Sequence, residues 1–304
     1  MRGRSEFFAT CPPGLARLLR DRLAATTGVE VTASGSDGEA DCVLYDADRD
    51  GRVRAAGLRL ADGVFATASR ARRNGSTDPA ALADRCWPRE GVQRALSLWA
   101  EQVRPLSPAM TFRVTARMRT GPRSLRTGLR AALADAIRRD RPRWRPSGQG
   151  ELEVLLSELR AGELVTGLRV AGNRPTTVSG LPSALAAAMV ALAGPPGGVL
   201  LDPACGHGEI LTEAAAAGWT AEGESAGHAS EILEPDDSVD ACVTSLALDP
   251  AAALAEMSRV TRSGGAVVVL AAEVPEYPPA LRLRRQVPVR LGSGRQVIWV
   301  FRRA

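Results

Sequence analysis

The sequence contains no lysine, so all 39 of its basic residues are arginine. Aromatic residues make up only 4% of the chain while hydrophobic residues make up 45%, so we expect aliphatic side chains to build the core. No apolar run is long enough to cross a bilayer, and the N-terminal residues lack the apolar stretch of a secretory signal. These absences predict a globular, cytoplasmic protein.

The five cysteines are far apart and include no Cys-x-x-Cys pair. This spacing argues against a zinc site and against a disulfide framework, so we predict no bound metal and buried, reduced thiols. At 304 residues the chain is long enough for two or three compact units.

Charge is distributed unevenly along the chain. Residues 1–172 carry 29 arginines and 20 acidic residues, a net charge of +9, whereas residues 173–304 carry 10 arginines and 14 acidic residues, a net charge of −4. This distribution suggests that the basic front part binds a polyanion and that the mildly acidic back part is a separate domain that carries out the chemistry.

The back part opens with a strand–loop–helix motif. Residues 198–201 form a short apolar strand, followed by Asp-Pro-Ala-Cys-Gly-His-Gly (residues 202–208) and a helix at residues 212–217. Glycines let the backbone approach a ligand without a clash from Cβ, and a helix N-terminus offers free N–H groups to a carboxylate. In such sheets ligands bind at the carboxyl ends of the strands.

This stretch resembles the first cofactor motif of class I S-adenosylmethionine-dependent methyltransferases, in the form typical of RNA-modifying members. The resemblance implies a Rossmann-like α/β fold and S-adenosylmethionine as cofactor. An apolar strand at residues 239–244, a turn at 263–265 before a strand at 266–271, and a terminal hairpin fit the same fold. The residues implied in cofactor binding are Asp202, Pro203, Ala204, Cys205, Gly206, Gly208 and, at the ribose, Glu224 (or Glu222).

The front part resembles THUMP-containing RNA methyltransferases. The resemblance rests on residues 7–15 (FFATCPPGL), residues 111–121 (TFRVTARMRTG) and residues 167–170 (GLRV), in that order. It implies an α+β ferredoxin-like domain at residues 1–103, a THUMP-like RNA-binding domain at 104–172 and a shortened methyltransferase domain at 173–304. Members of this family act mostly on tRNA and methylate the N2 amine of guanine.

Residues 104–145 hold 12 arginines and two acidic residues, which favours an RNA-binding surface. On the helix predicted after Pro122 the arginines fall on one stripe, beside an apolar face that can pack. Arginine makes forked contacts with phosphate. The candidate RNA-binding residues are Arg117, Arg119, Arg123, Arg126 and Arg130.

The sequence departs from the family at the catalytic motif. The family has Asp/Asn-Pro-Pro-Tyr/Phe at the end of the fourth strand, whereas residues 244–248 read Thr-Ser-Leu-Ala-Leu. Thr244 and Ser245 are candidates by position alone. Losing one preorganised polar contact costs about 3–4 kcal/mol in a transition state. The segment from residue 208 to 240 is also short and leaves room for one strand, at residues 219–224.

Three functions remain open at this point. The first is an RNA methyltransferase that acts on a tRNA base amine, guanine N2. The second is a catalytically inactive, methyltransferase-like RNA-binding protein, which the missing motif favours. The third is a small-molecule methyltransferase whose front part caps the substrate.

Overall fold

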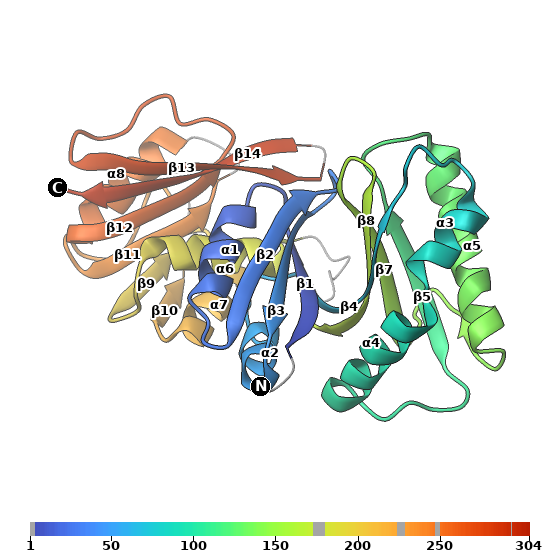
Figure 1. Ribbon diagram of the computed structural model, residues 1–304. Helices are drawn as coiled ribbons and strands as arrows, with labels where there is room; N and C mark the ends of the chain where they lie inside the picture. The colour runs from blue at the N-terminus through green and yellow to red at the C-terminus, as the bar shows by residue number, and fades with distance from the viewer. Residues whose placement is uncertain (1–3, 173–179, 224–228, 247–249, 293) are drawn as a thin grey trace. The chain divides into compact units, whose positions relative to one another are not determined.

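The computed structural model describes residues 4–172, 180–223, 229–246, 250–292 and 294–304 (Figure 1). The chain divides into two compact units, residues 1–174 and 175–304. Each unit has its own sheet. No helix in the described ranges is long and apolar enough to cross a membrane.

The front unit is built on an eight-stranded sheet with the order β2-β3-β1-β4-β8-β7-β5-β6. Neighbouring strands are antiparallel, except that β5 is parallel to both β6 and β7. The elements are β1 (Ser5–Cys11), α1 (Ala16–Ala24), β2 (Val29–Ser36), β3 (Asp41–Ala47), α2 (Arg49–Ala56), β4 (Gly63–Arg72), α3 (Pro79–Cys86), α4 (Arg89–Gln102), β5 (Thr111–Arg117), α5 (Arg123–Asp140), β6 (Arg145–Pro146), β7 (Leu152–Arg160) and β8 (Glu163–Ala171).

The first six elements follow the βαββαβ order of a ferredoxin-like unit, the fold that the resemblance implied for this part of the chain. Their four strands lie in the order β2-β3-β1-β4, and α1 and α2 pack on β2 and β3. Sequence reasoning missed α2. Its one local signal is Asp48, whose Oδ1 accepts a 2.7 Å hydrogen bond from the Gly51 amide and so caps the helix.

The long helix α5 has the two faces that its sequence predicted. Leu125, Leu129 and Leu133 are buried, whereas Arg123 and Arg130 are exposed. Asp78 caps α3, accepting a 2.9 Å hydrogen bond from the Ala80 amide. The helices α3 and α5 pack against each other, and α5 also covers β5.

One hydrophobic core joins the two halves of the front sheet. Side chains from β1, β3 and β4 meet side chains from β7 and β8; they are Phe8, Cys42, Leu44, Phe65, Leu155, Leu159 and Val165. Beside this core, Ser157 donates a 2.8 Å hydrogen bond to Asp37. A Cβ on Gly35 would lie 1.8 Å from the carbonyl oxygen of Leu159, so β2 can approach β7 only with glycine there. The domain boundary predicted at residue 103 therefore separates residues that share one hydrophobic core.

The back unit has a six-stranded sheet with the order β10-β9-β11-β12-β14-β13. The first four strands are parallel, whereas β14 is antiparallel to both β12 and β13. The elements are α6 (Ser183–Ala193), β9 (Val199–Asp202), α7 (Glu209–Ala217), β10 (Thr220–Gly223), β11 (Val239–Ser245), α8 (Pro250–Val260), β12 (Thr261–Ala271), β13 (Leu281–Leu291) and β14 (Gly294–Arg303).

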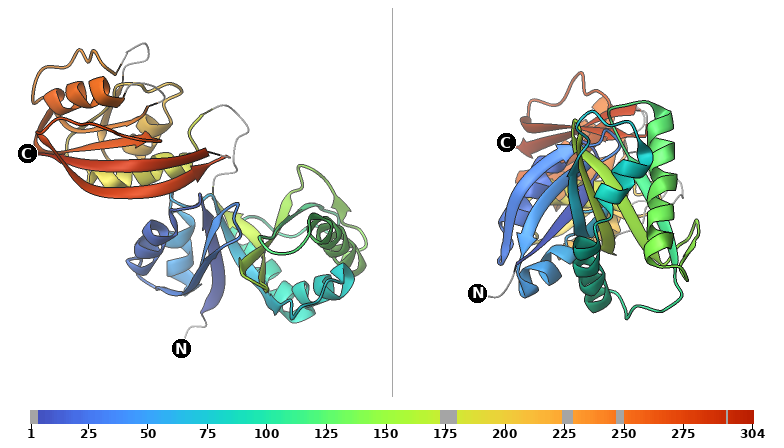
Figure 2. Two further views of the ribbon diagram at one scale, coloured as in Figure 1. Left: turned by 90° about the horizontal axis from the view of Figure 1, so that it is seen from above. Right: turned by 45° about the vertical axis from the view of Figure 1, so that its right-hand side comes forward.

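The parallel strands are wound in both directions from the centre of the sheet. The chain passes from β9 through α7 to β10 on one side, and from β11 through α8 to β12 on the other. Because such crossovers are right-handed, the two helices cover opposite faces, with α6 packed beside α7 (Figure 2). The strand order reverses between β9 and β11, which is where ligands bind in sheets of this kind.

The turn predicted at residues 263–265 is wrong, because these residues belong to β12. Val239 pairs with Thr261 and Ala241 pairs with Ala266, so β12 holds extra residues between two successive partners on β11. Gly264, at a φ of +75°, takes up this excess as an irregularity within the strand. A glycine pair predicts a bend, but only the pairing of the strands shows that the strand continues through it.

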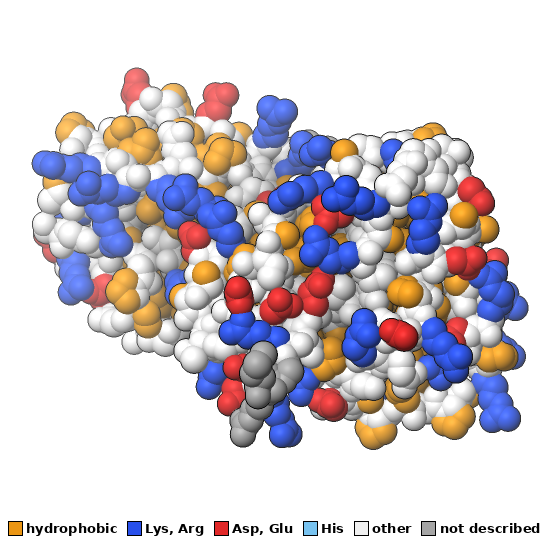
Figure 3. Space-filling model, viewed as in Figure 1, with side chains coloured by type: hydrophobic (Ala, Val, Ile, Leu, Met, Phe, Trp, Pro, Cys, Tyr) orange, Lys and Arg blue, Asp and Glu red, His pale blue; other side chains and the backbone are white. Residues whose placement is uncertain are grey.

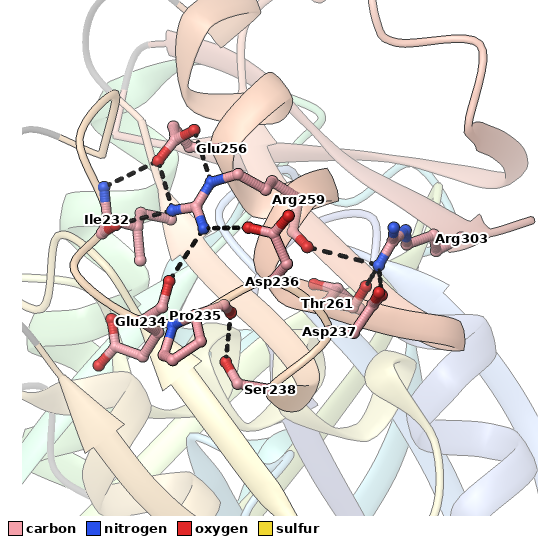
Figure 4. Close-up of polar contacts among 10 residues, drawn as sticks. All are labelled: Ile232, Glu234, Pro235, Asp236, Asp237, Ser238, Glu256, Arg259, Thr261 and Arg303. Carbon is pink, nitrogen blue, oxygen red and sulfur yellow. Dashed lines mark hydrogen bonds and ion pairs between the residues drawn. The ribbon is translucent and has the colours of Figure 1, made fainter.

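The short segment before β11 is held by one arginine rather than by further secondary structure. Arg259 of α8 donates hydrogen bonds to the carbonyl oxygens of Ile232 (2.8 Å) and Glu234 (3.0 Å), and it forms ion pairs with Asp236 and Glu256 (Figure 4). The hydrogen bond from Arg259 lowers the pKa of Glu256. These contacts lie at the amino end of β11, away from the carboxyl edge.

Candidate functional site

The glycine loop lies at the carboxyl end of β9, as its sequence predicted. Gly206 and Gly208 have φ values of +51° and +79°, which L side chains rarely adopt. A Cβ on Gly208 would meet nothing within 4 Å, so the space beside this glycine is open. Gly208 is the N-cap residue of α7 and, as a glycine, offers no side chain to cap the helix N-terminus. The loop therefore leaves its backbone accessible and provides open space for a ligand.

Asp202 and Thr244 bridge the point at which the strand order reverses. Asp202 ends β9 and Thr244 lies near the end of β11, the neighbouring parallel strand. The Thr244 hydroxyl donates a 2.7 Å hydrogen bond to Oδ1 of Asp202, and the Ala204 amide donates a second one of 3.2 Å to the same atom. The carboxylate is thus fixed in orientation at the base of the site.

Burial raises the pKa of the Asp202 carboxyl to about 6, because water is removed from the charged form. The hydrogen bonds from Thr244 and from the Ala204 amide lower the pKa, because they stabilise the ionised carboxylate. A buried carboxyl with a shifted pKa, at the switch point of an α/β sheet, is typical of a binding or catalytic site.

The other residues predicted at the cofactor lie in three different environments. Pro203 is buried, Ala204 and Cys205 are partly buried, and Gly206 is exposed. Gly223 ends β10 so close to the loop that its Cβ would lie 3.0 Å from Cβ of Cys205. Glu224 lies outside the described residues. The alternative, Glu222, is exposed near the carboxyl end of β10.

The two positional candidates for catalysis differ in what they can touch. Thr244 is fully buried and its hydroxyl donates to Asp202, so it positions that carboxylate instead of facing a substrate. Ser245 ends β11 and is exposed. Sequence reasoning missed the role of Thr244 because the two residues are 42 positions apart.

Two of the five candidate RNA-binding arginines of the front unit pair with Glu39, a residue that the sequence did not single out. Arg126 pairs with Glu39 at 2.9 Å and Arg117 pairs with it at 3.8 Å. The side chains of Arg119, Arg123 and Arg130 form no ion pair with any described residue and are exposed. Glu39 therefore neutralises part of the positive charge of these five arginines, and the described acidic residues leave the rest unpaired.

A second basic feature of this unit is a cleft of about 600 Å³ that no sequence pattern indicated. It lies between the end of β4, the loop before α5 and the turn between β7 and β8, and Arg72, Arg73 and Arg160 line it. The Arg73 guanidinium donates a 3.2 Å hydrogen bond to the carbonyl oxygen of Thr120. The cleft brings arginines from distant parts of the chain together.

Comparisons with known proteins agree with this geometry. The model of the family described as "RMKL-like, methyltransferase domain" matches residues 172–246. The crystal structure of TrmN from Thermus thermophilus superposes with a TM-score of 0.69 at 22% sequence identity, covering 98% of this chain and 99% of that chain. At 22% sequence identity, this similarity shows that the two proteins share a fold. No curated protein sequence matches significantly.

Two further solved structures match in part. Magnesium protoporphyrin IX methyltransferase from Synechocystis, solved with S-adenosylmethionine, has a TM-score of 0.32 at 13% identity, covering 40% of this chain and 76% of that chain. PH1313 from Pyrococcus horikoshii has a TM-score of 0.37 at 13% identity, covering 66% and 60%. The match to the methyltransferase-domain family thus covers residues 172–246, which include the glycine loop and the strands on both sides of the point where the strand order reverses.

Proposed function

We propose that this protein methylates RNA, and that its substrate is a base amine of tRNA, guanine N2. The observation that carries the RNA assignment is the arginine stripe of α5, which stays at the surface beside the buried apolar face of the helix. An arginine surface of this density fits phosphates. The narrowing to tRNA and to guanine N2 rests on the resemblance of the motifs to THUMP-containing methyltransferases.

The loop at the carboxyl end of β9 fits the amino-acid end of S-adenosylmethionine. The open space beside Gly208 leaves the backbone accessible, and the uncapped N-terminus of α7 directs N–H groups toward a carboxylate. Asp202 supplies a carboxylate for the amino group, and Thr244 fixes its orientation. When bound, the cofactor supplies an activated methyl group.

The end of β11 offers few side chains that could form a hydrogen bond with the substrate. Ser245 is exposed there and can accept one hydrogen bond from an exocyclic amine. Such a bond orients the amine and leaves its lone pair directed at the methyl group. A hydroxyl is a weaker acceptor than the carboxylate of the family motif, so we expect a slow reaction.

Transfer of a labelled methyl group to total RNA tests the proposal. We expect label in the tRNA fraction with the wild-type protein and none with Asp202→Ala, which lacks the carboxylate. Digestion of the product to nucleosides identifies the base. Label in protein or in small molecules but not in RNA would contradict the proposal.

A second function is favoured by one observation. The Thr244 hydroxyl is committed to Asp202, and residues 244–246 provide no acid, amide or aromatic side chain for a base. A chain of this kind can bind RNA without methylating it. Salt-sensitive tRNA binding without methyl transfer, together with no calorimetric signal from S-adenosylhomocysteine, would support this second function over the first.

A further inference from the structure

The basic cleft of the front unit is lined by three segments that are distant in the sequence. They are the end of β4, the loop before α5 and the turn between β7 and β8. Figure 3 shows arginine side chains at the surface of the front unit around that turn. The volume of the cleft, about 600 Å³, lies within the range of roughly 300–1,000 Å³ that is usual for ligand pockets, so the cleft can hold a ligand the size of a nucleotide.

Hydrogen bonds hold the three segments of the cleft together. The Arg73 amide, just after β4, donates a 2.7 Å hydrogen bond to the carbonyl oxygen of Gly162 in the turn. The buried carboxylate of Glu158 accepts a 2.8 Å hydrogen bond from the Gly162 amide. The same carboxylate accepts hydrogen bonds from the amides of Arg119 (2.9 Å) and Thr120 (2.7 Å) in the loop before α5. The walls are therefore fixed before a ligand enters, which lowers the cost of binding.

The three arginines of the cleft form no ion pair with a described residue. Arg72 and Arg160 are exposed, and Nη2 of Arg160 donates a 3.4 Å hydrogen bond to the carbonyl oxygen of Ser34. Arg73 is partly buried, and a Cβ on Gly121 would lie 2.8 Å from its Nη1. Glycine at position 121 thus leaves room for this guanidinium group. All three guanidinium groups are available to an anion in the cleft.

The charge of the cleft matches a terminal phosphate better than a phosphate inside an RNA chain. The lining side chains carry three positive charges and one negative charge, a net charge of +2. The negative one belongs to Glu163, which pairs with Arg70 at 2.6 Å. A phosphate monoester carries a charge of about −1.5 to −2 at pH 7 and has three strong acceptor oxygens, whereas an internal phosphate diester carries a single charge. Guanidinium groups make forked contacts with such oxygens.

We propose that this cleft binds the 5′-terminal phosphate of the RNA substrate. The inference rests on the proposed function, since it needs an RNA substrate. RNA chains ordinarily end in a phosphate at the 5′ end and in a hydroxyl at the 3′ end, so the monoester lies at the 5′ end. The loop that contributes Thr120 to the cleft leads directly into α5, whose first residue is Arg123. An RNA held in the cleft by its end can therefore continue along the arginine stripe, with its register fixed by the terminal phosphate.

The test compares two forms of one tRNA transcript, with and without its 5′-phosphate, on variants of the full chain. Both forms carry a fluorescent label at the 3′ end, and binding is measured by fluorescence anisotropy. The cleft variant is Arg72→Gln/Arg160→Gln; Arg73 is kept because it holds the loop before α5. The control of equal charge is Arg17→Gln/Arg22→Gln, two exposed arginines of α1 that form no ion pair with a described residue. Thermal unfolding is followed on the same samples.

We expect the wild-type protein to bind the phosphorylated transcript about tenfold more tightly than the hydroxyl form, because hydrogen bonds to the charged phosphate are lost with it. The cleft variant should bind both forms with equal affinity, through the stripe on α5 that it retains. The control should keep the preference of the wild type. Because all four substituted arginines are exposed, the Tm of both variants should equal that of the wild type within error.

Equal affinity of the wild-type protein for the two transcripts would overturn the cleft proposal alone and leave the RNA function in place. A preference that persists in the cleft variant would also overturn it, because the 5′-phosphate would then bind elsewhere. Adenosine 5′-monophosphate is the competing probe: displacement of the transcript by this nucleotide at equal affinity would assign the cleft to a free nucleotide. Absence of binding of either transcript by the wild type would remove both this inference and the RNA function.

Discussion

Thr244 donates a 2.7 Å hydrogen bond to Oδ1 of Asp202 across the two central parallel strands of the back unit. Thr244, which was a candidate for catalysis by position alone, thereby orients a carboxylate of the glycine loop. This relationship links the ends of two neighbouring strands at the candidate site, and burial of the same carboxyl raises its pKa to about 6.

Replacing Asp202 by Asn should stabilise the protein at neutral pH. The pKa of Asp202 is about 6 in the folded state against an ordinary value of 3.8, so the folded state holds the proton more tightly. Stability from this group is therefore present at low pH and is lost as pH rises from about 4 to 6. We expect Asp202→Asn to gain up to about 3 kcal/mol at pH 7.5 and little at pH 4.

Thermal unfolding at both values of pH measures this gain. A variant that is less stable than wild type at pH 7.5 would show that the ionised carboxylate is stabilised by contacts beyond those of Thr244 and Ala204.

Cofactor binding should weaken below pH 6. An ionised Asp202 attracts the amino group of the ligand, and protonation removes that attraction. Calorimetry with S-adenosylhomocysteine should show affinity falling about tenfold for each pH unit below 6. In Asp202→Asn the affinity should be low and independent of pH; an equal pH dependence in that variant would assign the titration to another group.

Gly208→Ala and Gly264→Ala form a matched pair. Both glycines have positive φ, at +79° and +75°, and in neither case would a Cβ meet an atom within 4 Å. Each substitution should therefore cost about 1–2 kcal/mol from backbone strain alone. Only Gly208→Ala should lose affinity for S-adenosylhomocysteine, because only that methyl group enters the open space of the loop. Equal affinity in the two variants would contradict the placement of the cofactor.

Removing the charge of Glu39 should strengthen RNA binding. Glu39 pairs with Arg117 and Arg126, so Glu39→Gln frees both guanidinium groups for phosphate. We expect a rise of a few fold in tRNA affinity, with a steeper dependence on salt. The control is Glu101→Gln, which frees Arg52 on other elements. A similar rise in the control, or a fall in Glu39→Gln, would argue against the stripe on α5.

A fragment of residues 1–103 should not fold by itself. Phe8, Leu44 and Phe65 pack against Leu155 and Val165, so the fragment would expose a core that the full front unit buries. Fully burying a side chain of this size contributes about 1.5–3 kcal/mol. Circular dichroism should show a cooperative thermal transition for residues 1–174 and none for 1–103; a cooperative transition in the short fragment would establish it as an independent domain.

The sequence by itself determined the features that depend on near neighbours. The glycine loop of residues 202–208 has positive φ at Gly206 and Gly208, and α5 has the apolar face that its leucine spacing predicted. Asp78 caps α3 for the same local reason. Each of these follows from backbone sterics or from contacts three to four residues apart, which a pattern along the chain can report.

Only the tertiary structure decided which distant residues meet. Asp202 and Thr244 are 42 positions apart, and Glu39 and Arg126 are 87 apart. The register between β13 and β14 shifts between Leu283 and Arg285. Strand order, register and the approach of one strand to another are set by the burial of side chains from the whole unit, and no local spacing records them.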